Sequence, residues 1–484
     1  MTTGPDVFVD TRPPAGRCDI TRRLSNNLFL QMPLRSIVLG LALIFTFGLS
    51  SPARGEDGPE AAASSEKQAS LYNQWMEKAG EGIQGIYTGG FHIYWKDGLH
   101  LDSWKKNLKF TINGRIEIDA GYIGADDELD AAFPNLAGGD VNLRTFQVAM
   151  ACKIRDAADL KLTFDFANAR EIKDNWIKFK KIPFVGHFTF GYMKEPISLE
   201  YMTGGKNITF MERSLPVLAF APGRDFGFAR RATALDKRLT WTVGGFWVTG
   251  SYSDVGDAND RLSESFGAAI TGRISYLPRH ADEGRTLLHV GLSYTHQFRD
   301  ESRDDSQLKA SALPESYLTD DTLVGTGKIP TGGIDLVGLE IASVFGPSSL
   351  QGEFFQSFVN SDSAGNPRFW GFYVCGSHFL TGEHRNYNRD AGVFSHVIPN
   401  QGFHPMKGQW GAWEAAFRFS FVDLNSGDIR GGKEANFTAG LNWYWDSKLR
   451  IMFNYIHARV SDRAEPSVDL GRANIIQTRL QVLF

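Results

Sequence analysis

The chain has 484 residues, of which 42% are hydrophobic and 22% charged, and its formal net charge is −4. This composition excludes a largely disordered chain, and the slightly acidic balance excludes a general basic surface for nucleic acid. A mean hydropathy of −0.25 excludes a bundle of apolar membrane helices. A membrane β-barrel stays possible, because its strands are apolar on one face only.

The N-terminal part predicts an export signal. Arg35 precedes a run of 13 apolar or small residues at 37–49, and small residues follow at 51–55. This order is typical of a secretory signal peptide. The alternative is a transmembrane anchor, but the run covers only about 20 Å of the ~30 Å hydrocarbon core. We therefore expect a signal peptide at 32–55, with 1–31 untranslated or a pre-signal extension.

Residues 56–90 predict a periplasmic leader, because they are rich in Ala, Ser and Glu near their start. Leu71, Trp75 and Ala79 are four residues apart, which also allows a short helix within this leader. The remainder, 91–484, is predicted to form a single barrel domain.

The dominant pattern from residue 107 onward has a period of two. Successive side chains of a strand point to opposite faces, so such a pattern predicts one apolar wall and one polar wall. The same alternation recurs at 409–423, 433–445 and 473–484. In the first segment the apolar face carries Leu108, Phe110, Ile112, Gly114, Ile116, Ile118 and Ala120, and the polar face carries Lys109, Thr111, Asn113, Arg115, Glu117 and Asp119.

Sixteen segments of this kind are predicted. Many reach the 9–11 residues that a membrane-crossing strand needs. An even number fits an antiparallel barrel, and closure satisfies every backbone group in lipid. The fold class is therefore all-β: a sixteen-stranded antiparallel transmembrane β-barrel with a loop inserted in its lumen. The predicted strands are 107–124, 141–154, 159–167, 172–180, 187–194, 226–234, 238–249, 265–278, 286–300, 332–345, 348–359, 368–379, 409–423, 433–445, 448–460 and 473–484.

The connections are predicted to alternate in length, with short turns at one end of the barrel and long loops at the other. The turns at 346–347 and 446–447 are short, whereas 250–264, 301–331 and 381–408 are long and polar. Aromatic residues near strand ends, as at 410–413 and 443–445, predict a girdle at the membrane interface, although ordinary packing is the alternative.

The connection at 195–225 is unusual, because its many apolar residues do not form an obvious strand. An apolar loop in a barrel is better placed inside the wall, so we expect a constriction. Its flanking and internal cations are the candidate anion-binding residues. The alternative is that Arg213 and Glu212 only pin the loop through ion pairs. The candidates are Lys194, Lys206, Arg213 and Arg224.

Further cations fall on predicted strands and are expected to line the pore. These are Lys109, Arg115, Arg144, Lys161, Arg273, Arg418 and Arg479. Enzyme motifs are absent from the sequence: it has no G-x-S-x-G, no H-E-x-x-H and no P-loop. No metal site and no cofactor are predicted, so the expected activity is passive diffusion rather than catalysis.

Several segments together resemble the phosphate-selective porin O and P family, over a region from about residue 91 to the C-terminus. They are GYMKEPISLE at 191–200, TFMERSLP at 209–216, APGRD at 221–225, LTGEHRNYNRDAGVF at 380–394, GAWEAAFR at 411–418, LNWYW at 441–445 and QTRLQVLF at 477–484.

The resemblance implies a sixteen-stranded porin in the outer membrane of a Gram-negative-type cell envelope, in contact with outer-membrane lipid. It also implies a homotrimer, a third loop folded into the lumen, and passage of phosphate or polyphosphate through a pore lined by Arg and Lys. By this resemblance Lys194, Lys206 and Arg213 form the central anion site. Because the chain is net acidic, any preference for small inorganic anions has to be local. Two alternatives are a general, weakly selective porin and a plugged structural or adhesive barrel.

The C-terminal residue generates a first testable prediction. Phe484 shares an apolar strand face with Leu480 and Val482, which resembles the assembly signal of outer-membrane barrels. Deleting Phe484 should lower the yield of folded, heat-modifiable protein measured by gel electrophoresis. Phe484→Tyr, which keeps the aromatic ring, is the control and should assemble normally. Normal assembly of the deletion variant would contradict the prediction.

Overall fold

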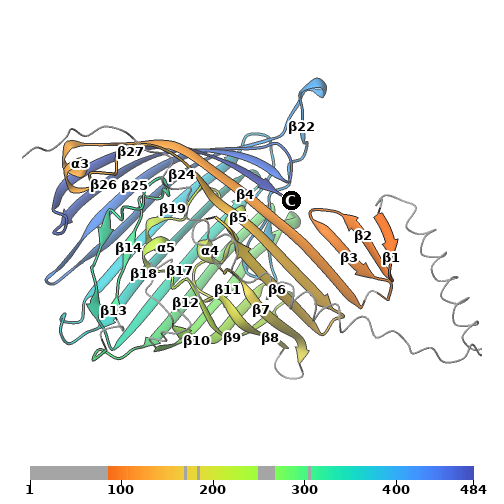
Figure 1. Ribbon diagram of the computed structural model, residues 1–484, viewed down its shortest axis with the longest axis horizontal. Helices are drawn as coiled ribbons and strands as arrows, with labels where there is room; N and C mark the ends of the chain where they lie inside the picture. Colours follow the sequence, from red (N-terminus) through yellow and green to blue (C-terminus); the bar gives the residue numbers. More distant parts are fainter. Residues whose placement is uncertain (1–84, 106, 168–171, 183–185, 249–266, 304–306) are drawn as a thin grey trace, which may run out of the picture. The chain divides into compact units, whose positions relative to one another are not determined.

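A computed structural model describes residues 85–484 apart from 106, 168–171, 183–185, 249–266 and 304–306 (Figure 1). The described residues belong to one compact unit, Ile83–Phe484. The predicted pre-signal extension, the signal peptide, most of the leader and the predicted loop at 250–264 lie outside the described residues. The helices among the described residues are all shorter or more polar than a bilayer-crossing helix would have to be.

Sixteen antiparallel strands close into a barrel. Each strand pairs with the next along the chain, and β27 pairs with β4 from Leu483 opposite Arg115 to Ala473 opposite Ala125. The strands are β4 (Leu108–Ala125), β5 (Gly138–Ile154), β6 (Ala158–Asp165), β7 (Asn175–Ile182), β8 (Gly186–Lys194), β9 (Arg224–Ala234), β10 (Leu239–Val248), β11 (Gly267–Ala281), β12 (Thr286–Phe298), β17 (Gly333–Phe345), β18 (Ser348–Asn360), β19 (Arg368–Phe379), β24 (Ala412–Ser426), β25 (Ile429–Tyr444), β26 (Leu449–Arg463) and β27 (Val468–Leu483).

Each of the sixteen predicted strands overlaps one of these, so the predicted fold class is confirmed. The largest shifts are at β27, which begins at 468 rather than 473, and at β25, which begins at 429 rather than 433. β24 was expected to begin at 409 but begins at 412. Gln409–Trp410 instead forms β23, which pairs with β22 (Phe403–His404) in a separate hairpin. Gly411 turns the chain between β23 and β24 with a φ of 70°, a conformation that glycine adopts without strain.

The predicted faces are also confirmed. On β25 the polar residues Glu434, Asn436 and Thr438 are fully buried, whereas Phe437 between them is 41% exposed. Polar side chains therefore face the interior, and the outer surface is apolar, as a barrel in lipid requires. Large apolar residues on that outer surface include Phe228, Trp247, Ile270, Leu339, Val374, Phe417, Phe453 and Ile476.

A small antiparallel sheet precedes the barrel. It consists of β1 (Gly85–Thr88), β2 (Phe91–Trp95) and β3 (Leu99–Ser103). β3 pairs with β4 over Leu99–Asp102, beyond the point where β27 ends. The last residues of the predicted leader thus form β1.

The two ends of the barrel differ in their connections. One end, here called the terminal end, carries the start of β4 and Phe484, and most of its connections are short turns such as 235–238 and 346–347. Short turns mark the periplasmic side of such barrels. The long connection at 380–411 also lies at the terminal end, because β19 ends there and β24 begins there. The prediction that this connection lies with the other long loops, at the opposite end, is therefore wrong.

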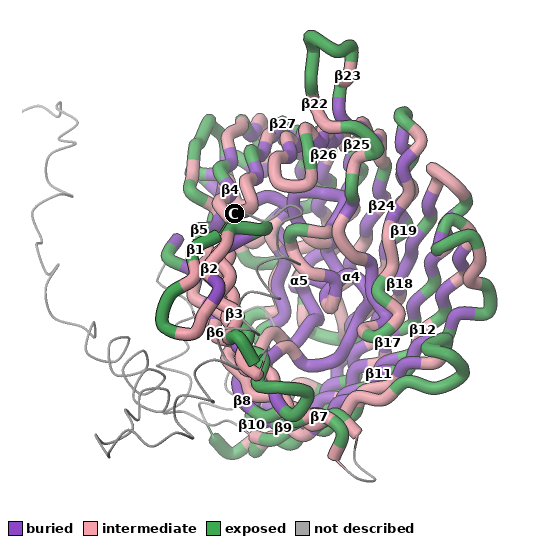
Figure 2. The backbone as a smooth tube through the Cα atoms, turned by 90° about the vertical axis from the view of Figure 1, so that its right-hand side faces the viewer, coloured by how far each residue is buried: buried purple, intermediate pink, exposed green. Residues whose placement is uncertain are grey.

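Three connections fold into the barrel. The first, 195–223, contains α4 (Leu199–Met202), η3 (Gly205–Asn207) and α5 (Leu215–Phe220), and Figure 2 shows α4 and α5 inside the ring of strands. The second is 299–332, without residues 304–306, which lie outside the described residues, and the third is the first half of 380–411. They carry the short ribbons β13 (Gln307–Leu308) with β16 (Ile329–Pro330), β14 (Ser311–Ala312) with β15 (Val324–Gly325), and β20 (Tyr387–Asn388) with β21 (Val393–Phe394). Three further short helices are α3 (Asp127–Ala132), η4 (Asp282–Gly284) and η5 (Pro405–Lys407).

An apolar core fills one side of the lumen. Phe220 of α5 is fully buried and packs near Phe355 of β18, with ring centroids 6.5 Å apart. Leu199 of α4 packs in a second cluster with Val393 and Phe394. The sequence of 301–331 and 381–408 did not indicate these contacts, because each connection is mostly polar and only a few of its residues are apolar. The inserted segments leave the side of the lumen along β4–β10 open.

The face assignment predicts the cost of a charge on the outer surface. Phe417 of β24 is 52% exposed on that surface. Phe417→Arg should reduce the free energy of unfolding by about 2–4 kcal/mol, because an arginine near mid-bilayer leaves water. Urea unfolding of lipid-reconstituted protein measures this loss. The control is Leu235→Arg in the β9–β10 turn, where Leu235 is 63% exposed outside the strands. Equal losses at the two positions would show that the face assignment is wrong.

Candidate functional site

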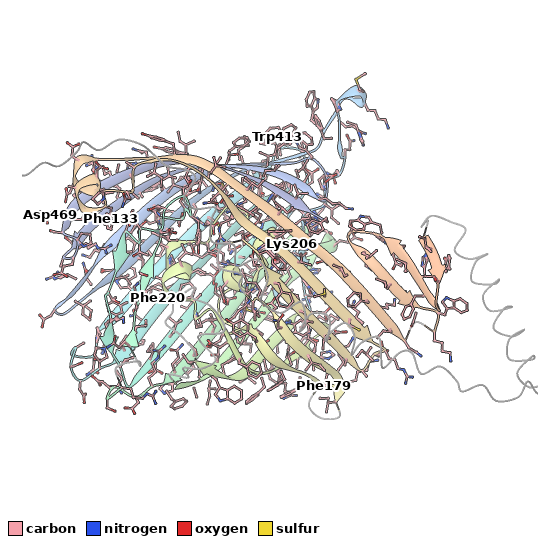
Figure 3. All side chains as sticks on the ribbon, in the orientation of Figure 1. Phe133, Phe179, Lys206, Phe220, Trp413 and Asp469 are labelled. Carbon is pink, nitrogen blue, oxygen red and sulfur yellow. The ribbon has the colours of Figure 1, made fainter. Side chains whose placement is uncertain are left out.

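A cavity of about 950 Å³ lies between the β4–β10 wall and the inserted connection 195–223. The wall contributes inward-facing residues of seven neighbouring strands, and the connection contributes Tyr201, Gly205 and Met211 among others. The polar face predicted from the sequence therefore borders open space along these strands. Lys206, in the short helix η3 of the connection, also lines the cavity (labelled in Figure 3).

The lining of this cavity carries twice as many basic as acidic residues. The excess is local, because the whole chain has a net charge of −4. The twelve basic residues are Arg115, Arg144, Lys161, Lys173, Lys178, Lys180, Lys194, Lys206, Arg213, Arg224, Arg231 and Arg479, and the six acidic residues are Glu117, Asp159, Asp165, Asp174, Glu212 and Asp390.

Glu212 holds the inserted connection against the wall. Its carboxylate accepts hydrogen bonds from Arg144 Nε at 2.8 Å and from Arg479 of β27. Arg479 also binds Asp119 through two nitrogens, at 2.7 and 2.6 Å. Burial alone would raise the pKa of the Glu212 carboxyl, but the two guanidinium groups outweigh burial and hold that pKa below its usual range. Arg144 and Arg479 thus line the cavity, but much of their charge is neutralised.

Arg213 makes no ion pair among the described residues, whereas the pinning alternative expected one. Its guanidinium donates to the backbone oxygens of Tyr201 and Thr203, at 3.4 and 3.3 Å. Lys194 donates to the same Tyr201 oxygen. Both cations also lie over the Tyr201 ring, with Lys194 Nζ 4.6 Å and Arg213 Cζ 5.4 Å from its centroid. Neither cation has a carboxylate partner among the residues that the structure describes, so two like charges converge on one tyrosine.

Arg224 and Lys161 share one carboxylate. Asp174 accepts from Arg224 Nε at 2.7 Å and from Lys161 Nζ at 2.8 Å. The three groups carry a net charge of +1. This arrangement holds Arg224 at the far end of the inserted connection, where that connection joins β9.

Arg115 and Lys206 both line the cavity, where the backbone next to Lys206 lies close to Arg115. Arg115 pairs with Glu117 at 3.3 Å, and a Cβ added at Gly205 would meet Arg115 Nη1 at 2.9 Å. The backbone at 205 therefore approaches the guanidinium closely, which favours glycine there. Lys206 is exposed and has no ion-pair partner in the described part of the chain. It extends the row of basic groups toward the terminal end.

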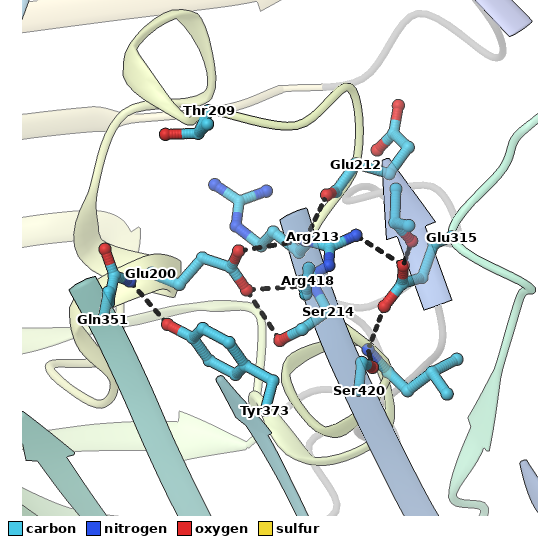
Figure 4. A network of polar contacts seen from close by, with 12 residues as sticks. Glu200, Thr209, Glu212, Arg213, Ser214, Glu315, Gln351, Tyr373, Arg418 and Ser420 are labelled. Atoms are coloured by element: carbon cyan, nitrogen blue, oxygen red, sulfur yellow. Dashed lines mark hydrogen bonds and ion pairs between the residues drawn. The ribbon is translucent and has the colours of Figure 1, made fainter. Parts of the chain in front are cut away.

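Three predicted pore-lining residues do not border this cavity. Arg418 is fully buried in a network that ties α4 and α5 to β24 (Figure 4). It binds Glu315 at 2.6 Å and Glu200 at 3.3 Å, and it lies over the Phe210 ring at 4.4 Å. Its predicted contact with the pore is wrong, because the connections 195–223 and 299–332 cover it.

Arg273 and Lys109 are the other two. Arg273 is buried and binds Glu340 through two nitrogens, at 2.8 and 2.7 Å. It also donates to the oxygen of Gly392 in the third inserted segment. Lys109 lies near the start of β4, 4.0 Å from Asp102 of β3. A position on the polar face of a strand thus places a cation inside the barrel without deciding whether it meets water.

Several cavity residues were not singled out from the sequence. Lys178, Lys180 and Arg231 lie on predicted strands 172–180 and 226–234, with side chains on the inward face. The alternation that identified Arg115 could have found them. Lys178 lies over the Trp176 ring at 4.6 Å. Among the described residues, no group of His, Cys, Asp or Glu side chains is arranged to hold a metal ion.

Comparison with known proteins places this architecture among porins. Residues 110–484 match the model of the family described as phosphate-selective porin O and P. The chain is 27% identical over 370 residues to an uncharacterised protein of Caulobacter vibrioides, covering 75% of this chain and 71% of that one. It is 22% identical over 421 residues to Porin O of Pseudomonas aeruginosa, covering 80% and 91%.

A solved structure shares the fold. The outer-membrane channel DcaP of Acinetobacter baumannii superposes with a TM-score of 0.50 and 11% identity, over 78% of this chain and 98% of that chain. At this identity the similarity concerns the fold alone. It agrees with the closed barrel described above.

The Arg418 network generates a prediction about stability. Arg418→Met should cost about 3–5 kcal/mol of unfolding free energy, because it leaves Glu200 and Glu315 buried without their shared cation. Arg231→Met is the matched control, since Arg231 also faces the interior but hydrogen-bonds only the Thr242 hydroxyl among the contacts described (3.3 Å). Urea midpoints in lipid vesicles compare the two variants. A loss no larger for Arg418 than for Arg231 would contradict the structural role of the network.

Proposed function

The chain belongs to the phosphate-selective porin O and P family and is an outer-membrane channel, and from this premise we propose that it conducts small anions, with phosphate or polyphosphate as the expected substrate. The observation that carries the proposal is the excess of basic over acidic residues around the cavity. Low-dielectric walls that carry one sign of charge raise the local concentration of the opposite ion. A net acidic protein can therefore still select anions.

The inserted connection 195–223 is proposed to be the constriction. The cavity is lined by Lys206 and Arg213 of this connection and by Lys194, the last residue of β8. None of the three pairs with a carboxylate among the described residues. Guanidinium offers paired donors that match phosphate oxygens, and ammonium adds a compact charge. Several such groups in series can bind an anion without trapping it, which conduction requires.

We propose a smaller contribution to anion binding from five other cations, which are Arg115, Arg144, Lys161, Arg224 and Arg479. Each lines the cavity, but each also has a carboxylate partner: Asp174 for Arg224 and Lys161, Glu117 for Arg115, and Glu212 for Arg144 and Arg479. An anion that approaches these cations meets the field of the carboxylates as well. Their main effect would be to set the electrostatic potential along the wall.

The homotrimer implied by the resemblance remains a prediction, which the mass of the detergent-extracted protein would test.

Neutralising the cations without carboxylate partners should reduce anion selectivity. In a wet site with an effective dielectric constant of about 40, a charge ~8 Å from the ion contributes about 1 kcal/mol. Lys194→Gln or Arg213→Gln should thus lower the anion permeability about fivefold and raise the cation permeability about fivefold, so that the anion-over-cation ratio falls roughly 25-fold. The measurement is the reversal potential of single channels in gradients of potassium phosphate and of potassium chloride. Weaker block of chloride current by phosphate is expected in the same variants.

The matched control is Lys181→Gln. Lys181 pairs with Asp156 outside the cavity, with its side chain 70% exposed, and its loss should leave the reversal potential unchanged. If Lys194→Gln and Arg213→Gln keep wild-type selectivity but lower thermal stability, the two cations are structural and the anion filter lies elsewhere. A wild-type channel without anion preference would indicate the general porin, and a wild type without conductance would indicate the plugged barrel.

A further inference from the structure

The second half of the connection 380–411 forms a hairpin that the channel function does not explain. Residues 402–411, here called the lateral arm, contain β22, η5 and β23. Figure 2 shows the ring of strands with α4 and α5 inside it and the arm outside the ring, and Figure 1 also shows the arm standing clear of the barrel. The first half of the same connection packs inside the lumen, so the chain passes from the interior to the outside of the barrel.

The root of the arm is held by a cluster of aromatic rings. The Phe403 ring lies 5.2 Å from Trp443 and 4.8 Å from Trp445 between centroids, and 5.9 Å from Trp410 across the hairpin. Trp443 Nε1 donates to the Trp410 oxygen at 2.8 Å, and Phe403 N donates to the Trp445 oxygen at 2.6 Å. These contacts fix the direction in which the arm leaves the barrel.

A pair of tryptophan side chains marks the height of this root along the barrel. Trp443 is directly opposite Trp413 in the β24–β25 register, and their rings stack 5.0 Å apart (Trp413 is labelled in Figure 3). Tryptophan is enriched where the apolar band of a membrane protein meets the headgroups. An arm that leaves sideways at this height runs along the surface of the lipid.

The exposed side chains of the arm fit such a surface. Met406 at its tip is 97% exposed and Trp410 is 59% exposed. The stretch 398–411 contains Lys407 and His404 but no acidic residue. An apolar side chain, an exposed indole and a lysine without neighbouring carboxylates are the groups that interfacial segments present to acyl chains and phosphate headgroups.

We infer that the lateral arm is a lipid anchor, which inserts Met406 and Trp410 into the headgroup region of the periplasmic leaflet. Lys407 faces the lipid phosphates there. The anchor would steady the terminal end of the barrel, where the first half of the same connection closes one side of the lumen. It is independent of the anion selectivity proposed above, since none of its residues borders the cavity.

Site-specific labelling of the full-length protein tests this inference. Met406→Cys is labelled with an environment-sensitive NBD fluorophore and reconstituted in vesicles of phosphatidylethanolamine and phosphatidylglycerol. The control is Leu235→Cys in the β9–β10 turn of the same end, which is 63% exposed but does not belong to an arm. Cys18 is replaced by Ser in every variant. The protein with this change alone is the blank, because Cys152 and Cys375 are both buried. Heat modifiability confirms that each variant is folded.

The label at 406 should emit at shorter wavelength than the label at 235. Lipids with a spin label near the headgroup should quench it at least about twofold more strongly. Adding Lys407→Glu should reduce that quenching more in vesicles with phosphatidylglycerol than in vesicles of phosphatidylcholine alone. Solvent-like emission at 406 with quenching equal to that at 235 would overturn the inference. Efficient disulfide cross-linking between two copies of the unlabelled Met406→Cys variant would also overturn it, because the arm would then contact a second copy of the chain.

Discussion

Peptide groups inside a lipid bilayer have no water to bind, so every strand of this chain needs a paired neighbour on both sides. The pairing of β27 with β4 meets that need for the first and last strands, and it turns the sheet into a ring. Closure then sorts every strand into an outer and an inner face. Outer residues such as Phe417 and Ile476 meet lipid, and inner residues such as Thr438 are shielded from it.

The inner face creates a second problem, because a ring of sixteen strands encloses more space than its own side chains fill. Three connections occupy that space. α5 brings Phe220 into an apolar core against β18 and β19, while 299–332 and the first half of 380–411 pack beside it. The lumen is thus divided into a packed side with an apolar core and an open side lined by charge along β4–β10.

This division gives the interior cations two different roles. On the packed side Arg418 and Arg273 are covered and bound by carboxylates, so they hold the inserted segments in place. On the open side, Lys194 and Arg213 bind backbone oxygens and the Tyr201 ring and no carboxylate among the residues that the structure describes. Desolvated charges remain in a protein only when they are paired, whereas a cation that borders water can keep its field available to a passing ion. The positive potential is therefore concentrated where an ion could move.

The alternation of apolar and polar residues determined the number of strands, their approximate bounds and the direction in which each side chain points. It could do so because the period of two is a property of the strand backbone itself and needs no knowledge of distant residues. The apolar content of 195–225 likewise indicated a loop folded inside the wall. Only the tertiary structure decided which interior cations remain without a carboxylate. Arg479 is bound to Asp119 of the neighbouring strand β4 across 360 positions of sequence, and Arg418 is bound to Glu200 across 218. Such pairs depend on which strands and connections become neighbours in the fold. The place of 380–411 at the terminal end and the insertion of 299–332 were decided in the same way, because a few buried apolar contacts outweigh the polar composition of a long connection.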